Sequence, residues 1–219
     1  ATSLYRVDRL YRESLAAYRA AGSRGSLSEI AGRLEGEYLS SFLQPVAEKW
    51  QAASVKMSGP VPDHVLSQRR FFDSVVGPYL SEGKKLVVII SDALRYEAGK
   101  RLEEELNAKR GLVAETESAI GTPPTITSVG MAALLPHQSI SLSPGGTVQI
   151  DGESIGGIDG RSDYLRKAVG RRYPGLRAAA FRARDISSLP APAAREIING
   201  LDLIYVYSNG IDAAGDNAK

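Results

Sequence analysis

Three aspartates follow closely on two apolar runs of the sequence. The run over residues 86–90 leads into Asp92, and the run over residues 203–207 leads into Asp212 and Asp216. If the two runs are neighbouring strands of a parallel sheet, the three carboxylates meet at its carboxyl edge, where such sheets bind ligands. Carboxylates held close together repel one another unless cations neutralise their charge. The pattern therefore predicts a divalent-metal site at this edge.

Each aspartate also has a purely structural interpretation. Asp92 is a suitable N-cap for a helix that begins at Ala93. Asp212 and Asp216 are typical residues of a turn around Gly215. The spacing alone leaves these interpretations open beside the metal site.

The segment between the two runs carries hydroxyl groups at a predicted helix start. Thr125 and Thr127 stand at the beginning of a short predicted helix over residues 127–135. Free backbone N–H groups and the helix dipole favour a phosphate at such a position, so either hydroxyl is a candidate nucleophile for phosphorus. An ordinary threonine cap is the alternative.

The elements that must position these side chains fall into two parts. Apolar residues recur at three- and four-residue intervals up to residue 80, so we predict a helical segment over residues 1–84. The β-branched run at 86–90 predicts a strand buried on both faces, and hence an α/β fold with a mostly parallel central sheet flanked by helices over residues 85–219. The other predicted elements of this part are helix 94–106, strand 112–119, helix 127–135, strand 147–150, helix 161–172 and strand 203–207.

Composition narrows the class of protein and of site. Of the 219 residues, 43% are hydrophobic and 24% are charged, which is typical of globular chains and excludes collagenous or wholly disordered ones. Because the chain has no cysteine and only His64 and His137, a metal site must rest largely on carboxylates. No apolar run approaches the roughly 18 residues of a membrane span, and no signal-peptide pattern opens the sequence, so we expect a cytoplasmic protein without membrane contact.

A basic stretch over residues 161–184 bears on partners. It holds eight arginines and lysines against the single acid Asp163, whereas the whole chain has a net charge of only +2. Such a stretch is a candidate contact for the phosphate backbone of nucleic acid. The alternative is the solvated face of a helix.

Three motifs, taken together, resemble a known family. They are K-L-V-V-I-I-S-D-A-L-R-Y-E at 85–97, T-S-V-G-M-A-A-L-L-P-H at 127–137 and I-Y-V-Y-S-N-G-I-D-A-A-G-D at 204–216. In this order they closely resemble the PglZ domain of the bacteriophage-exclusion (BREX) and phage-growth-limitation defence systems. Residues 5–12 and 35–43 are similar to the helical region that precedes this domain in larger PglZ proteins.

The resemblance implies a fold and an activity of the alkaline phosphatase superfamily. It implies a phosphatase or phosphodiesterase with two metals, commonly zinc, acting on phosphate esters such as nucleic acid or nucleotides. By motif, Thr127 takes the place of the nucleophile that bridges the metals, and Asp92 that of the first-strand ligand. Asp212 and Asp216 fall on the D-x-x-G-H pattern of the superfamily, with aspartate replacing histidine. The implied partners are other proteins of a phage-defence system.

The sequence departs from the family pattern at two places. The family usually reads Tyr-His-Asn where this chain has Ser208 between Tyr207 and Asn209. The superfamily's later Asp-His pair and final His ligand come from segments beyond D-x-x-G-D, so we expect this chain to be a fragment whose core, residues 85–219, is incomplete for catalysis. The alternatives are a non-catalytic scaffold of a phage-defence complex and a nucleotide-binding module without hydrolysis.

Overall fold

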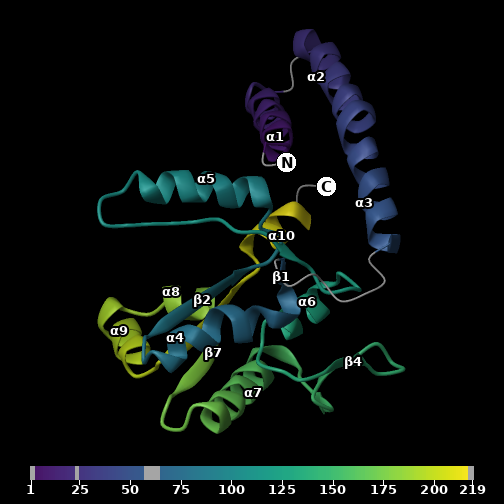
Figure 1. The fold of residues 1–219 in the computed structure, drawn as a ribbon. Coiled ribbons are helices and arrows are strands. Elements are labelled where there is room, and N and C mark those ends of the chain that lie inside the picture. Colours follow the sequence, from purple (N-terminus) through teal and green to yellow (C-terminus); the bar gives the residue numbers. More distant parts are fainter. Residues whose placement is uncertain (1–2, 23–24, 57–64, 217–219) are drawn as a thin grey trace. The chain divides into compact units, whose positions relative to one another are not determined.

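The computed structural model describes residues 3–22, 25–56 and 65–216, and it confirms the α/β fold class. The chain groups into two compact units, one formed by Ala1–Pro62 with Arg95–Ser118 and the other by Asp63–Leu94 with Ala119–Lys219. The first unit is helical, and the second contains the sheet (Figure 1).

The helical unit is built around an aromatic stack. Its elements are α1 (Tyr5–Ala20), α2 (Gly25–Glu37), the π-helical segment η1 (Tyr38–Leu43), α3 (Gln44–Lys56) and α5 (Tyr96–Asn107). Tyr38 is buried and stacks on Tyr11 with ring centroids 3.7 Å apart. The Tyr38 hydroxyl donates to Oδ1 of Asp8 at 2.5 Å, which joins η1 to α1.

Helix α5 belongs to the helical unit although it follows the first strand of the sheet in sequence. Nη1 of Arg9 on α1 lies 2.9 Å from Oε2 of Glu104 on α5, and the rings of Tyr5 and Tyr96 meet edge to face. The predicted helix 94–106 is thus confirmed in type, with its start moved to Tyr96.

A three-stranded parallel sheet forms the centre of the second unit. Its strands, in spatial order, are β2 (Leu86–Ser91), β8 (Leu203–Ser208) and β7 (Ala178–Arg182). The register pairs Ser91 with Ser208, and Arg182 with Tyr207. The prediction that the two apolar runs are neighbouring parallel strands is confirmed, because β2 and β8 pair along their whole length.

One face of this sheet carries the core of the unit. Side chains of β8 such as Leu203 and Tyr205 pack with Leu165 of α7 (Gly157–Arg172) and with Phe72 of the π-helical segment η3 (Phe72–Val76). All four side chains are almost fully buried, at most 1% exposed. The helix α4 (Gly77–Ser81) adds Leu80 to the same cluster.

The prediction that the strand at 86–90 is buried on both faces is wrong for the described residues. Val87 is 45% exposed and Ile89 is 70% exposed, whereas Leu86, Val88 and Ile90 pack against the core. The reason is that β2 is an edge strand of the described sheet and the core covers only one of its faces, so alternate side chains point outward.

The remaining elements surround the sheet. They are the strand pair β1 (Leu66–Ser67) and β3 (Ala119–Ile120), the 3₁₀ turn η2 (Gln68–Arg70), α6 (Thr127–Ala133), the antiparallel sheet β4 (Ile140–Leu142), β5 (Val148–Ile150) and β6 (Glu153–Ser154), and the helices α8 (Ala183–Ser187), α9 (Ala191–Asn199) and α10 (Gly210–Asp216). The predicted strand at 112–119 is wrong except at its last residue, since no strand pairs with 112–118 and Val113 is 97% exposed.

The two compact units do not divide the chain at residue 84. Phe72, Val76 and Leu80 belong to the core of the sheet unit, while α5 belongs to the helical unit. The division into a helical segment 1–84 and a PglZ core 85–219 stays a prediction about domains. None of the helices in the described part of the chain is long and apolar enough to cross a membrane.

Candidate active site

A cavity of about 510 Å³ opens at the carboxyl edge of the parallel sheet, and we call it the edge cavity. It is lined by Asp92, which follows β2, and by residues of α6, α7, β7, α8, β8 and α10, all within the sheet unit. Asp92, Thr127 and Asp212 are among the lining residues. The structure therefore brings together three of the four residues that the sequence predicts for the site.

Asp92 is held in a tight turn directly after β2. Its backbone N–H donates to the carbonyl oxygen of Ser208 at 2.8 Å, and its Oδ1 accepts the N–H of Ala93 at 3.0 Å. Ala93 has a φ of 59°, a conformation that costs a residue with a side chain about 1–2 kcal/mol. Because α5 begins only at Tyr96, the N-cap interpretation of Asp92 is wrong. Strain of this kind is concentrated at functional sites.

Thr127 presents a free hydroxyl to the edge cavity. It is the first residue of α6, the N-cap is Ile126, and no side chain caps this helix, so the interpretation of Thr127 as a cap is wrong. The Thr127 side chain is exposed and hydrogen-bonds to no other residue of the described ranges. Thr125 lines a neighbouring cavity of about 280 Å³, which Asp92 and Thr127 also border, and it does not line the edge cavity. Of the two candidate nucleophiles, Thr127 is the one that shares a cavity with both aspartates.

Asp212 lies in the first turn of α10, which follows β8. The N–H of Ala213 donates to the carbonyl oxygen of Asn209 at 2.9 Å, so this stretch is helical and the turn interpretation of Asp212 is wrong. Asp216 ends the same helix, four residues further on, but its side chain lies outside the described residues. Its role as a ligand stays a prediction.

The donors in the edge cavity fit a divalent cation in part. Asp92, Asp212 and Thr127 offer only oxygen atoms, which are ligands for magnesium and manganese and, in the case of carboxylates, also for zinc. Among the residues whose side chains the structure describes, no three histidines or acids lie close enough to hold a metal ion. The described residues therefore supply part of a coordination shell, since structural and catalytic zinc sites use three or four protein ligands.

The edge cavity also contains residues that the sequence analysis did not assign to the site. Arg161 of α7, Arg182 of β7 and Arg184 of α8 line it, although the sequence shows them only as members of the basic stretch. The Arg161 guanidinium lies 4.9 Å from the ring centroid of Tyr207. Burial raises the pKa of Tyr207 to about 12, although the Arg161 charge acts in the opposite direction.

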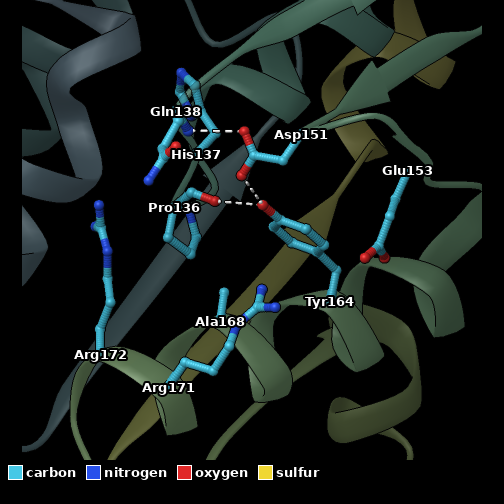
Figure 2. Close-up of a pocket in the computed structure, with 9 residues that line it drawn as sticks. All are labelled: Pro136, His137, Gln138, Asp151, Glu153, Tyr164, Ala168, Arg171 and Arg172. Atoms are coloured by element: carbon cyan, nitrogen blue, oxygen red, sulfur yellow. Dashed lines mark hydrogen bonds between the residues drawn. The ribbon is translucent and has the colours of Figure 1, made fainter.

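A second cavity, of about 370 Å³, lies near the other end of α7 and is lined by a network of hydrogen-bonded residues (Figure 2). Oδ1 of Asp151 accepts the N–H groups of Gln138 at 2.9 Å and Ser139 at 2.8 Å, and Oδ2 accepts the Tyr164 hydroxyl at 2.9 Å. The same hydroxyl lies 2.9 Å from the carbonyl oxygen of Pro136. These contacts tie β5 and the 136–139 segment to α7 and use the groups at the centre of the cavity.

The Asp151 network predicts a pH-dependent stability. Burial alone would raise the pKa of the Asp151 carboxyl, but the hydrogen bonds from Ser139, Tyr164 and Gln138 outweigh it and lower the pKa below its ordinary value. The carboxylate therefore stabilises the fold above the unfolded-state pKa of about 3.9, and this contribution is lost as the pH falls through the folded-state pKa.

Asp151→Asn tests this prediction, because asparagine also tolerates the positive φ of 50° at this position. At pH 6 we expect the variant to unfold in urea with a free energy lower by about 1 kcal/mol, and we expect the difference to shrink progressively as the pH falls below about 3.9. A gap that stays constant as the pH falls would show that the carboxylate charge plays no part.

The chain matches a known protein family over most of its length. The fold is that of an alkaline phosphatase-like α/β domain, and a model described as the BREX system PglZ alkaline phosphatase-like domain matches residues 71–219. The chain belongs to this family. The resemblance inferred from the three motifs is confirmed.

Two curated relatives agree with this assignment. The chain is 32% identical over 226 residues to the alkaline phosphatase-like protein BrxZ of Escherichia coli O9:H4 (strain HS), and 28% identical over 219 residues to the alkaline phosphatase-like protein PglZ of Bacillus cereus (strain H3081.97). These alignments cover 99% and 98% of the chain. The chain spans 25% of the length of each relative.

Proposed function

We propose that this chain carries the nucleophile and part of the metal-binding shell of a metal-dependent phosphatase or phosphodiesterase that acts in BREX defence. The observation that supports the proposal is that Asp92, Thr127 and Asp212, which are 35 and 85 residues apart in sequence, line one cavity at the carboxyl edge of the sheet. Two carboxylates beside a free hydroxyl suit attack on phosphorus better than a purely structural role.

The roles of the chain's own residues follow from their chemistry. The Thr127 oxygen forms a bond to phosphorus, the bond from phosphorus to the leaving oxygen breaks, and the hydroxyl proton passes to solvent. Water then cleaves the phosphothreonine and frees the hydroxyl again. Asp92 and Asp212, with Asp216, would hold the divalent cation. When bound, the cation supplies positive charge that lowers the pKa of the hydroxyl and stabilises the transition state.

Zinc is the metal that we propose, in two sites whose remaining ligands lie outside the described residues. His137 does not line the edge cavity and His64 lies outside the described residues, so a complete shell needs groups other than those of this cavity. Three quarters of the length of the relatives lies outside their match to this chain. We place the missing ligands there.

The proposed substrates are phosphate esters of nucleic acid or nucleotides, and the proposed partners are the other components of a phage-defence system, in the cytoplasm. The basic residues near the edge cavity support an anionic substrate that extends past a single phosphate. The family description, which names the BREX system, supports the partners.

Hydrolysis of bis-p-nitrophenyl phosphate by the protein at its full natural length tests the proposal. Rates are measured with zinc, with manganese and with EDTA. We expect release of p-nitrophenolate that depends on added metal and is abolished by EDTA. Absence of hydrolysis with every metal would contradict the proposed enzyme.

A non-catalytic scaffold is the second candidate, and Ser208 is the observation that favours it. Ser208 lines the edge cavity where the family usually has histidine, and a serine can neither act as an imidazole base nor coordinate zinc as one does. An inert full-length protein that still binds other components of its defence system in a pull-down assay would support the scaffold. Heat protection by nucleotides and metal without product would instead indicate a nucleotide-binding module.

A further inference from the structure

The basic stretch 161–184 does not form one surface, because the fold divides it. Arg166 pairs with Asp163 at 2.8 Å, and Arg172 pairs with Asp73 at 2.5 Å. Arg171 lines the cavity around Asp151. The members that reach the edge cavity are Arg161, Arg182 and Arg184.

The strand order separates Arg182, the last residue of β7, from Asp92, which follows β2. The sheet runs β2, β8, β7, so Asp92 follows one outer strand of the described sheet while Arg182 ends the other. Two strand spacings of about 4.8 Å separate β2 from β7 by roughly 10 Å. The edge cavity therefore has Asp92 on one side and Arg182 on the other, which we call its basic end, with Tyr207 of the middle strand between them.

The charge at the basic end is only weakly neutralised. Arg161 makes no ion pair with any residue of the described ranges and lies over the Tyr207 ring. Arg182 and Arg184 share one carboxylate, that of Asp185, at 3.9 Å and 3.6 Å. These distances exceed those of the pairs made by Arg166 and Arg172, so the guanidinium groups remain available to an anion.

The unpaired hydroxyl of Tyr207 is a second, independent observation that points to a ligand. The residue is only 7% exposed, and its hydroxyl oxygen is buried with no hydrogen-bond partner in the described part of the chain. Leaving a buried hydroxyl unpaired is unfavourable, and such groups in native proteins call for an explanation. The hydroxyl keeps its proton at neutral pH, so a ligand oxygen in the edge cavity would pair with it as a hydrogen-bond acceptor.

We infer that Arg161, Arg182 and Tyr207 form a subsite for a second phosphate group of the substrate, with Arg184 at its rim. The inference rests on the proposed function, because it takes the scissile phosphate to lie at the end of the cavity that holds Asp92 and Thr127. It adds the substrate class: a phosphate ester that carries a further phosphate, as nucleotide units in a strand do, in preference to an ester with one phosphate. Guanidinium groups suit this role because they bind phosphate oxygens through two parallel hydrogen bonds.

A pair of chromogenic substrates tests the subsite in the full-length protein. Thymidine 5′-(p-nitrophenyl phosphate) carries one phosphate, and its 3′-phosphorylated counterpart carries two. We expect the second phosphate to raise kcat/KM about tenfold or more in the wild type, and Arg161→Gln with Arg182→Gln to bring the ratio between the two substrates close to one. Arg166→Gln, on the same helix but away from the edge cavity, is the matched control and should leave the ratio as in the wild type.

The results with the two substrates distinguish failure of the subsite from failure of the proposed hydrolase. If both substrates are hydrolysed with equal kcat/KM by the wild type, the subsite is wrong and the hydrolase proposal stands. If nothing is hydrolysed, the hydrolase proposal fails, and calorimetric titration with thymidine 3′,5′-bisphosphate and with thymidine 5′-monophosphate decides the subsite alone. The bisphosphate must then bind about tenfold more tightly, and the double variant must remove the difference; equal affinities would overturn the inference.

Tyr207→Phe gives a further readout that a purely structural role would not produce. Because the hydroxyl has no protein partner, its removal should leave the melting temperature unchanged or raised. Affinity for thymidine 3′,5′-bisphosphate should fall about fivefold or more through loss of one donor. A variant with unchanged affinity would remove Tyr207 from the subsite.

Discussion

Thr127→Ala is expected to lower hydrolysis of bis-p-nitrophenyl phosphate by roughly 10³-fold or more, because the substitution removes the attacking oxygen. The Thr127 side chain is exposed and makes no hydrogen bond within the described residues, so its loss should leave the melting temperature unchanged within error. The variant therefore separates a chemical role from a structural one. Initial rates at saturating zinc, together with a thermal melt of each protein, provide the measurement.

Two variants control this result. Thr125→Ala removes the same kind of hydroxyl two residues away, from a side chain that lines the neighbouring cavity and not the edge cavity, and should keep the wild-type rate. Thr127→Ser keeps a primary hydroxyl and should retain measurable activity. Equal rates for Thr127→Ala and the wild type would remove Thr127 from the mechanism.

Asp92→Asn is expected to have the second large effect, through the affinity for metal. The amide oxygen of asparagine can still accept the N–H of Ala93, so the turn after β2 should persist. The negative charge that attracts the cation is lost, and we expect the dissociation constant for zinc to rise by about 100-fold or more, with activity at limiting zinc falling in parallel. Titration calorimetry with zinc measures the first effect directly.

The control for this variant is Asp163→Asn. Asp163 is exposed, pairs with Arg166 and does not line the edge cavity, so zinc affinity should be unchanged. Asp212→Asn should behave like Asp92→Asn if the two carboxylates share one bound cation or one pair of cations. Wild-type zinc affinity in both cavity variants would show that the metal binds elsewhere.

The part of the site that the sequence predicted correctly depends on local signals. The two β-branched runs and the polar residues after them predict buried parallel strands with Asp92 and Asp212 at their carboxyl ends. These positions are kept in the fold because where a strand ends, and which residue follows it, are set largely by the nearest residues. The helix start at Thr127 was predicted for the same reason.

The basic end of the edge cavity could not be predicted because its strand has no distinctive signal. Strand β7 opens with three alanines, Ala178 to Ala180, which lack the β-branched pattern of the other two strands. Without β7 in the expected sheet, Arg182 looks like one more charge in a basic stretch. The contact between Arg161 and Tyr207 joins residues 46 positions apart and depends on how α7 packs on the sheet.

Two further predictions, the burial of 86–90 on both faces and the strand at 112–119, are wrong because contacts distant in sequence determine the structure there. The sequence 86–90 is apolar throughout, yet whether both faces of β2 are covered depends on which elements surround it. The segment 112–118 has strand-like residues but no strand to pair with, and the fold leaves it extended and without a ladder. Propensity alone does not report the presence of a partner.

The position of bound zinc shows whether Asp92 and Asp212 are metal ligands. Crystals of the full-length protein grown with zinc would be measured on both sides of the zinc absorption edge. We predict an anomalous peak within about 2.0–2.2 Å of a carboxylate oxygen of Asp92 or Asp212, on the side of the edge cavity that Thr127 borders. A peak bound only by other residues, or an empty edge cavity in crystals that hold zinc elsewhere, would contradict the account.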